Sequence, residues 1–236
     1  MQTVTSTTVT PQKRSKANTE PSSPDKVVEA INRGIMMRRY GPGHRLIEAD
    51  LAVSLSVSRS TIREALKQLA VQGVVRINPH RGAEIRPLSR LEAENLVQVL
   101  EVLCGLAARL AAEHINDSSE DRERFILAAD ALSGDEASLM SNDQFVAARR
   151  AYYVAMFAIA QNPELDRLMP VPQIHLFRSQ FQSYLKPRDI ADMRREYRDI
   201  SDAILASKVD PAETRMRQHM RRTIDRLDTI DADAFI

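Results

Sequence analysis

The stretch Leu46–Gly82, LIEADLAVSLSVSRSTIREALKQLAVQGVVRINPHRG, decides the fold of the N-terminal part of the chain. Apolar residues recur at helical spacing from Leu51 to Leu55 and stop at Ser56. Ser58 then offers a hydroxyl that suits a helix N-cap. After it, one helix face is apolar: Ile62, Ala65, Leu66, Leu69 and Ala70. This pattern predicts two short helices joined by a tight turn and packed at a steep angle.

The opposite face of the second helix is polar and basic. A helix fits the DNA major groove, where Arg pairs with the edge of guanine. Ser and Thr hydroxyls and the amides of a helix start suit phosphates. We therefore expect this face and its surroundings to bind DNA. The predicted DNA-binding residues are Arg45, Ser58, Arg59, Ser60, Thr61, Arg63, Lys67, His80, Arg81 and Gly82.

Two short strand candidates follow the helix pair. Val74–Ile77 and Ala83–Ile85 flank the turn-rich tip Asn78–Gly82, which carries two basic side chains. The sequence thus predicts a winged helix-turn-helix with a small two-stranded wing. Two surface helices with a solvated basic face are the alternative. The coincidence of helix pair, turn, basic helix face and basic wing favours DNA binding.

Residues Val27–Arg86 resemble the GntR family of bacterial transcription regulators, whose motif is close to L..E..LA..L.VSR.T.R.AL..L...G.......RG. Two positions depart from it. Ala49 stands where some members of the fatty-acid-responsive branch carry a DNA-contacting Arg, and Ser56 stands where the turn often has Gly. The resemblance implies a homodimer whose two recognition helices read a pseudo-palindromic operator in double-stranded DNA.

Charge is distributed unevenly along the 236 residues, although the net charge is only +1. Residues 1–88 hold 14 Lys and Arg against 7 Asp and Glu, and residues 89–236 hold 19 against 25. A basic N-terminal third fits phosphate contact by that part alone. Cys104 is the single cysteine, which excludes an internal disulfide and favours a reducing compartment.

Residues 1–23 are rich in Thr, Ser, Pro and Gln and predict a disordered tail. They lack the apolar run of a signal peptide, and we expect no membrane span of ~20 apolar residues further on. The protein is therefore expected to be cytoplasmic, without a membrane partner. A first helix, Pro24–Arg39, opens the DNA-binding domain at 24–86, and 87–90 forms a short linker.

Helical patterns fill the second domain, 91–231, and no strand is convincing. Breaks such as Asn162-Pro163 and Lys186-Pro187 separate the helices. The chain is thus predicted to be mainly α, with an all-α bundle of six or seven helices after the winged domain. The expected helices are Leu91–Ile115, Ser119–Leu132, Asn142–Gln161, Val171–Leu185, Arg188–Ser207 and Pro211–Ile230.

This half resembles the FCD effector domain of the FadR-type GntR branch, in the segments Leu100–Ala112, Phe157–Leu165 and Ala212–Met220. The resemblance implies a pocket inside a helical barrel. In many members one Asp and three His hold a divalent metal there, and the metal holds the carboxylate of a metabolite. These four family positions fall on Arg149, Tyr153, Tyr197 and His219.

One His, two neutral Tyr and a cation make a poor metal site, because a metal needs several converging N, O or S donors. We therefore predict no metal and no other cofactor. Arg149 is expected to clamp a small anionic effector such as a carboxylate, with hydrogen bonds from Tyr153, Tyr197 and His219. Arg178 and Gln182 are weaker pocket candidates, while His175 and His114 are expected to be structural.

The bland alternative for Arg149 is a salt bridge with Glu101 or Glu196, or a solvated rim position. For the tyrosines and His219 the alternative is ordinary core packing with satisfied polar atoms. Three rival functions also stay open: a regulator with a metal-dependent pocket, a helical enzyme domain, and an architectural DNA-binding dimer without effector. No nucleophile, paired-carboxylate or phosphate-loop arrangement supports an enzyme. The sequence favours a metabolite-responsive repressor released by its effector.

Overall fold

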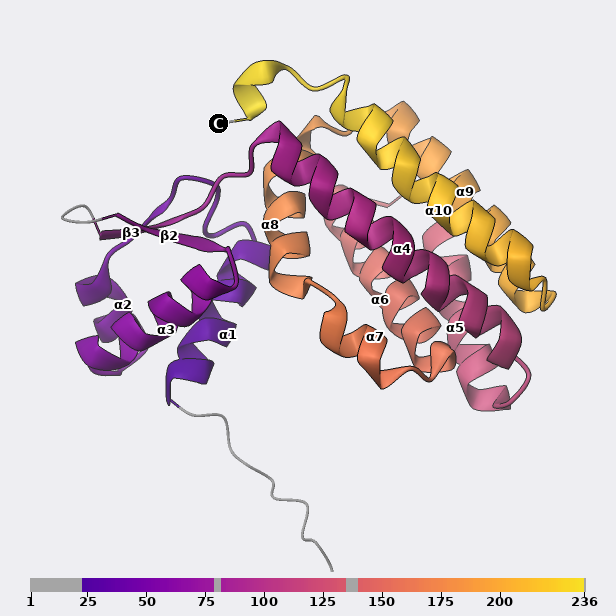
Figure 1. Cartoon of the computed structure of the whole chain (residues 1–236), viewed down its shortest axis with the longest axis horizontal. Coiled ribbons are helices and arrows are strands. Elements are labelled where there is room, and N and C mark those ends of the chain that lie inside the picture. Colours follow the sequence, from indigo (N-terminus) through magenta and orange to yellow (C-terminus); the bar gives the residue numbers. More distant parts are fainter. Residues whose placement is uncertain (1–22, 79–81, 135–139, 236) are drawn as a thin grey trace, which may run out of the picture.

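The computed structural model describes residues 23–78, 82–134 and 140–235 (Figure 1). Its N-terminal domain has three helices and a small sheet, and the sheet lies beside the helices at one end of the molecule. The elements are α1 (Ser23–Met36), β1 (Arg45–Leu46), α2 (Glu48–Ser54), α3 (Arg59–Val71), β2 (Val75–Asn78) and β3 (Gly82–Ile85). The predicted winged helix-turn-helix is confirmed. Of the tail expected at 1–23, residues 1–22 lie outside the described residues, and Ser23 begins α1 instead.

The turn between α2 and α3 explains one departure from the family motif. Ser56 has a φ of 53°, in the left-handed region that favours glycine. The amide of Val57 then bonds back to the carbonyl of Ala52 at 3.1 Å. Ser58 caps α3, and its hydroxyl accepts from the amide of Thr61 at 3.1 Å, as the sequence predicted.

The wing differs from the prediction. It has three antiparallel strands in the order β1-β3-β2, rather than two. The missed strand, Arg45–Leu46, pairs with β3 and is only two residues long. Such a short strand shows no alternation of apolar and polar residues, so only its pairing with β3 reveals it. The first helix is also shorter than expected and ends at Met36.

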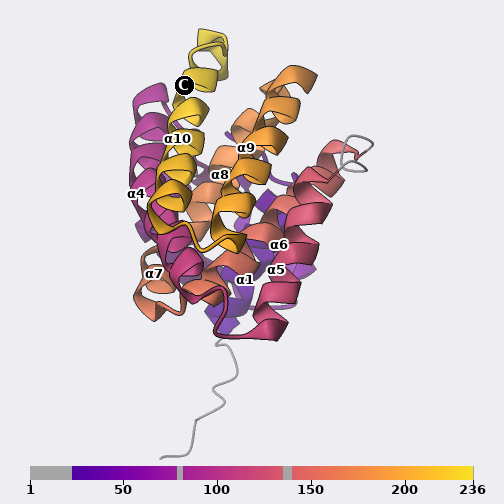
Figure 2. The ribbon, with the colours of Figure 1, turned by 90° about the vertical axis from the view of Figure 1, so that its right-hand side faces the viewer.

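The C-terminal domain is a bundle of seven α-helices within the described residues. The helices are α4 (Arg90–His114), α5 (Ser119–Ser133), α6 (Asn142–Ala160), α7 (Pro163–Leu168), α8 (Val171–Phe181), α9 (Pro187–Leu205) and α10 (Val209–Leu227). Helices α4 and α10 run side by side through most of the bundle's length (Figure 2). The short 3-10 helices η2 (Gln182–Tyr184) and η3 (Ala232–Ala234) complete the domain. The six-residue α7 was not predicted, because a helix of fewer than two turns gives no clear periodicity.

Helix α4 forms the centre of this domain. A capping box between Ser89 and Glu92 starts the helix. Small buried residues on one face, including Ala108, let α10 approach closely. A Cβ added at Gly105 would lie 2.8 Å from the Cγ of Arg217 on α10. Among the described helices, α4 alone is long and apolar enough for a membrane span, against the sequence expectation, but it is a core helix of this bundle.

Helix α8 connects the two domains. Leu176 and Phe181 on α8 belong to the same apolar cluster as the core of the winged domain. Between them, the side-chain amide of Gln180 accepts from the amide of Leu88 at 2.8 Å and donates to its carbonyl at 2.9 Å. Phe235, beyond the predicted domain end, stacks on Phe181 at 5.1 Å between ring centroids. The predicted linker is therefore fixed against α8.

Candidate DNA-binding face and effector cavity

The polar face of α3 is free to meet DNA. Arg59, Ser60, Arg63 and Lys67 are all exposed. Arg59 is the first residue of the helix, where a side chain reaches the base edges most easily. The Nε of Arg63 donates to Glu48 at 2.9 Å, so a DNA contact by Arg63 must replace this exposed ion pair.

Ser58 and Thr61 have local structural partners. The Ser58 hydroxyl lies 2.7 Å from that of Ser60 and 2.8 Å from that of Thr61. Together they form a polar cluster at the N-terminus of α3, where helix amides attract an anionic phosphate. The structure thus places these three predicted residues at one point of the face.

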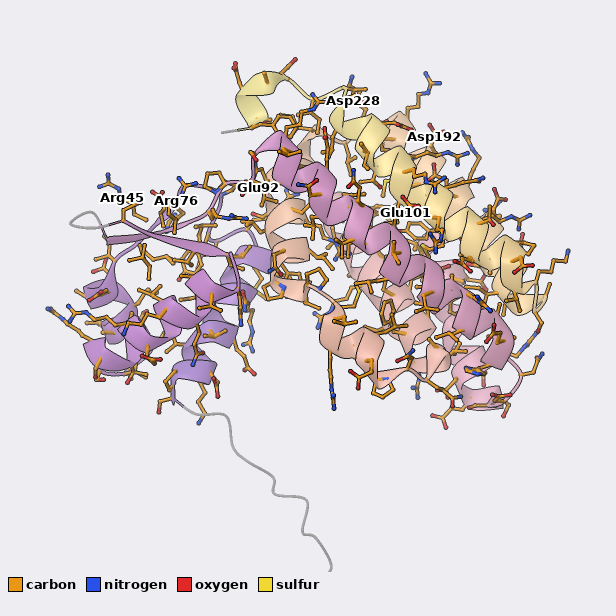
Figure 3. The ribbon with its side chains drawn as sticks, viewed as in Figure 1. Arg45, Arg76, Glu92, Glu101, Asp192 and Asp228 are labelled. Atoms are coloured by element: carbon orange, nitrogen blue, oxygen red, sulfur yellow. The ribbon has the colours of Figure 1, made fainter. Side chains whose placement is uncertain are left out.

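The sheet adds a second basic surface. Arg45 on β1 and Arg76 on β2 are both register partners of Glu84 on β3, so the three side chains share one face. Figure 3 shows Arg45 and Arg76 on the wing side of the domain. Arg76 was missed by the sequence analysis, although its place in a short strand could have suggested it. Gly82 has a φ of 85°, which explains the glycine, and the predicted contacts His80 and Arg81 lie outside the described residues.

In the helical domain the four family positions converge, although they lie on three helices. Tyr153 and Tyr197 have hydroxyl oxygens 3.3 Å apart, and the Tyr197 hydroxyl is 3.1 Å from Nε2 of His219. Nδ1 of His219 lies 2.5 Å from the carboxylate of Glu196. Arg149 lies over the ring of Tyr153, with its Cζ 6.0 Å from the ring centroid. These residues form a polar chain inside an apolar core.

The direction of hydrogen bonding along this chain follows from its buried end. Burial lowers the pKa of His219 to about 4, so the ring is neutral. Its Nδ1–H donates to the ionised Glu196, and Nε2 then accepts from the Tyr197 hydroxyl. Tyr197 in turn accepts from Tyr153. The oxygen of Tyr153 ends the chain and interacts with the guanidinium of Arg149.

Arg149 has no carboxylate partner among the described residues. Glu101 pairs with Arg221 at 2.7 Å, and Glu196 pairs with Arg226 at 2.7 Å. The alternative of a salt bridge from Arg149 to either acid is therefore wrong. The Nε of Arg149 is buried without a hydrogen-bond partner. Burial opposes its charge, but the nearby Tyr197 and Tyr153 oxygens outweigh that effect and raise the Arg149 pKa.

Arg149 faces a cavity with a volume of about 280 Å³. Arg178 and His175 on α8 also line it. From the sequence, Arg178 was only a weak pocket candidate, and His175 was expected to be a surface or structural residue. Burial raises the pKa of the Cys104 thiol to about 12, so this wall residue is an inert thiol, as expected of a core cysteine. The apolar wall consists of Val97, Leu100, Val154, Met169, Val171, Ile174, Phe177 and Met220.

The donor set does not fit the family's divalent metal. In the part of the chain that the structure describes, no three His, Cys, Asp or Glu side chains gather as a metal would need. Both ring nitrogens of His219 already have partners. The nearby cation Arg149 would also repel a metal ion.

The neutral His219 predicts a pH-dependent stability. Its pKa is lower in the folded state than the usual value of about 6.5, so the unfolded chain takes up the proton first. Stability should therefore fall as pH drops from about 6.5 to about 4, by on the order of 1 kcal/mol per pH unit. Urea unfolding across this range should show a shallower dependence in His219→Gln. The same substitution at the exposed His44 should leave the slope unchanged; a common slope for all three proteins contradicts the assignment.

Both domains are similar to known proteins. Residues 24–85 match the "Bacterial regulatory proteins, gntR family" description, and residues 95–222 match the FCD domain. A "Probable D-xylose utilization operon transcriptional repressor" of Paenarthrobacter nicotinovorans is 26% identical over 209 residues, covering 87% of this chain and 89% of that protein. The Escherichia coli repressor RspR is 30% identical over 100 residues, 42% of this chain and 44% of RspR. These relatives are transcription regulators and not enzymes.

Solved structures show the same fold. E. coli McbR/YncC superposes with a TM-score of 0.72 at 18% identity, covering 88% of this chain and 98% of that one. A regulator from Rhodococcus sp. RHA1 gives 0.70 at 19% identity, covering 89% and 99%. Together with the domain matches, these findings show that the chain belongs to the gntR family of bacterial regulatory proteins and carries an FCD domain.

Proposed function

We propose that this transcription regulator is a cytoplasmic homodimeric repressor, released from a pseudo-palindromic operator by a small organic anion such as a carboxylate. The anion binds in the FCD cavity without a metal. Arg149 contacts it directly, and Tyr153, Tyr197 and His219 hold the contact surface in place. One observation supports this above others: Arg149 is largely buried beside a cavity, with its Nε fully buried and no carboxylate partner in the described structure. A buried cation of this kind is costly unless an anion satisfies it.

The polar chain gives Arg149 a defined orientation. Tyr153 lies under the guanidinium, and its hydroxyl bonds to Tyr197, whose position is fixed by His219 and Glu196. The oxygen of Tyr153 attracts the Arg149 cation and leaves other guanidinium hydrogens to face the cavity. In this arrangement the arginine takes the electrostatic place of the family metal.

Helix α8 provides the connection between effector and DNA. Arg178 on α8 lines the cavity, while Gln180 holds the backbone of Leu88. At the N-terminal end of α8, Gln173 donates to the carbonyl of Gln72, the C-cap of the recognition helix α3, at 2.5 Å. A ligand that shifts α8 therefore changes the position of the winged domain. The coupling free energy between ligand binding and DNA binding is typically ~1–3 kcal/mol.

The proposed dimer has a suitable surface on α4. Leu91, Val99 and Val102 lie on one side of the helix and are 65%, 53% and 51% exposed. An apolar stripe on a long central helix is a common place for subunit contact. A two-fold dimer formed there would present one copy of α3 to each half-site of a symmetric operator.

Replacement of the buried arginine tests the pocket. Arg149→Ala should keep operator affinity within about twofold, because α3 is untouched, and should lose the effector response. The measurement is operator binding by anisotropy with and without small carboxylates and sugar phosphates, after a thermal-shift screen of metal-stripped protein. Arg167→Ala, an exposed arginine on α7, is the matched control and should respond like the wild type.

Three results would contradict the proposal. An unchanged response in Arg149→Ala would remove the arginine from the ligand site. A response only after addition of zinc or manganese would establish the metal-dependent regulator instead. If no anion changes operator affinity, with or without metal, the architectural dimer is the better description.

A further inference from the structure

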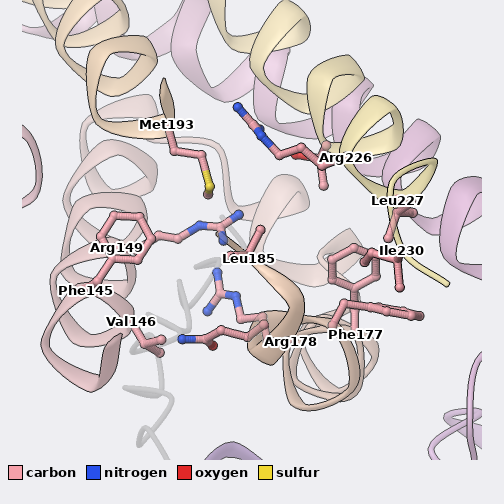
Figure 4. Close-up of a pocket in the computed structure, with 13 residues that line it drawn as sticks. Phe145, Val146, Arg149, Phe177, Arg178, Leu185, Met193, Arg226, Leu227 and Ile230 are labelled. Atoms are coloured by element: carbon pink, nitrogen blue, oxygen red, sulfur yellow. The ribbon is translucent and has the colours of Figure 1, made fainter. Parts of the chain in front are cut away.

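The proposed effector cavity contains a second arginine that is largely buried and has no acidic partner among the described residues. Arg178 on α8 and Arg149 on α6 point toward one another into the same space (Figure 4). Both line the main cavity and a smaller adjoining one of about 50 Å³. The Nε atoms of both side chains are buried and lack a hydrogen-bond partner. Two guanidinium groups held together in this way repel each other.

Acidic side chains of the protein do not offset this repulsion. No Asp or Glu is among the described residues that line either cavity. Arg226, which lines the smaller cavity, shows the contrast, because it is bound to Glu196 at 2.7 Å. Burial first, and the charge of Arg149 second, lower the pKa of Arg178 to about 10, so both arginines are charged at neutral pH. The pair therefore presents two uncompensated positive charges to a ligand.

A monoanion would neutralise only half of this charge. A dianionic head offers one negative charge and at least two acceptor oxygens to each guanidinium fork. The Thr223 side chain also lines both cavities, and its hydroxyl donates to the carbonyl of His219 at 3.2 Å, so the two arginines are the donors that face the head. The rest of the main cavity is apolar on the α4 side, at Val97 and Leu100, and near α8, at Ile174. This wall suits a hydrocarbon or aromatic body and not a polyhydroxylated one.

We propose that the effector is an organic dianion whose head bridges Arg149 and Arg178 and whose apolar body lies against α4 and α8. This inference rests on the effector pocket proposed above and narrows its ligand class. A phosphate monoester and two adjacent carboxylates share this chemistry. Arg178 is thereby assigned as a binding residue that discriminates by ligand charge.

Three probes with one aromatic ring separate these cases: benzoate with one charge, phthalate with two carboxylates, and phenyl phosphate. The pH is kept well above the second phosphate pKa of about 6. Calorimetric titration at equal ionic strength should give the wild-type protein a Kd at least about tenfold lower for one of the dianions than for benzoate. The reason is that the dianion makes charged hydrogen bonds to both arginines, whereas benzoate carries only one charge. The preferred dianion identifies the head group.

Arg178→Gln should remove the preference and bring the dianion and benzoate to similar Kd values. The exposed Arg167→Gln should keep it. Thermal unfolding without ligand checks the fold, and Arg178→Gln should be at least as stable as the wild type, because it relieves the repulsion. Equal binding of all three probes, no binding of any to the wild type, or a preference that survives in Arg178→Gln overturns the proposal.

These outcomes differ from failure of the proposed function. If benzoate binds as well as the dianions and depends on Arg149, the anion-responsive regulator stands and only the paired-arginine head is wrong. If a dianion binds through both arginines but leaves operator affinity unchanged, the ligand class stands and the regulatory role is wrong.

Discussion

Arg59→Ala should lower the affinity for the specific operator by on the order of 100-fold or more. A bidentate contact from Arg to a base is worth about 1–3 kcal/mol, and a dimer makes the contact twice. Arg59 is exposed at the first position of α3 and has no ion-pair partner in the described structure, so its removal disturbs no packing. Anisotropy titration with operator DNA and footprinting measure the effect.

The same variant should bind random DNA only a few fold more weakly, because phosphate contacts supply most of that affinity. Footprints on the wild-type complex should show two half-sites related by two-fold symmetry. Arg124→Ala, at an exposed position on α5, provides the control with the same change of charge. Wild-type affinity in Arg59→Ala, with protection of the operator intact, would remove α3 from base recognition.

Glu196→Gln should cost about 3 kcal/mol or more of unfolding free energy, the largest stability effect expected in the chain. Glu196 is 6% exposed and holds three cationic or donor partners: His219 at 2.5 Å, Arg226 at 2.7 Å and Arg222 at 3.2 Å. Without its charge, Arg226 is left buried and uncompensated. Urea unfolding at neutral pH and fixed protein concentration measures the loss.

Glu101→Gln is the matched control. Glu101 also contacts two arginines, Arg221 at 2.7 Å and Arg217 at 4.0 Å. Arg221 is 63% exposed, so water replaces the lost partner and the expected cost is below about 1 kcal/mol. Similar losses in the two variants would show that Glu196 is an ordinary surface acid in solution.

The winged domain was predictable because its patterns are local. The apolar stripe of α3, the cap at Ser58 and the basic face all lie within a few turns of one helix. The third strand was not predictable, since Arg45–Leu46 is a strand only through its pairing with β3. Helix ends differed by a few residues, as at Phe181, where α8 gives way to the 3-10 helix η2.

The proposed effector site also has features that could be predicted from the sequence and features that could not. Family positions placed Arg149, Tyr153, Tyr197 and His219 together, and the structure has them in one chain of contacts. Their partners could not be predicted, because Glu196 reaches His219 from another helix. Arg178 was a weak candidate for a similar reason. Its spacing to Gln182 indicates a shared face, but only the fold shows that this face meets Arg149.

Helix α8 has a consequence for how such a regulator could acquire a new signal over evolutionary time. Arg178, which lines the cavity, and Gln180, which bonds the linker residue Leu88, are two residues apart. A substitution on this helix that reshapes the pocket therefore also alters gene expression before any signal is present, and selection acts against it. The wall residues Val97, Leu100 and Met169 instead pack in the core of the helical domain and not in the apolar cluster shared with the winged domain. Lineages of this protein should diversify their signals through those walls while α8 changes slowly.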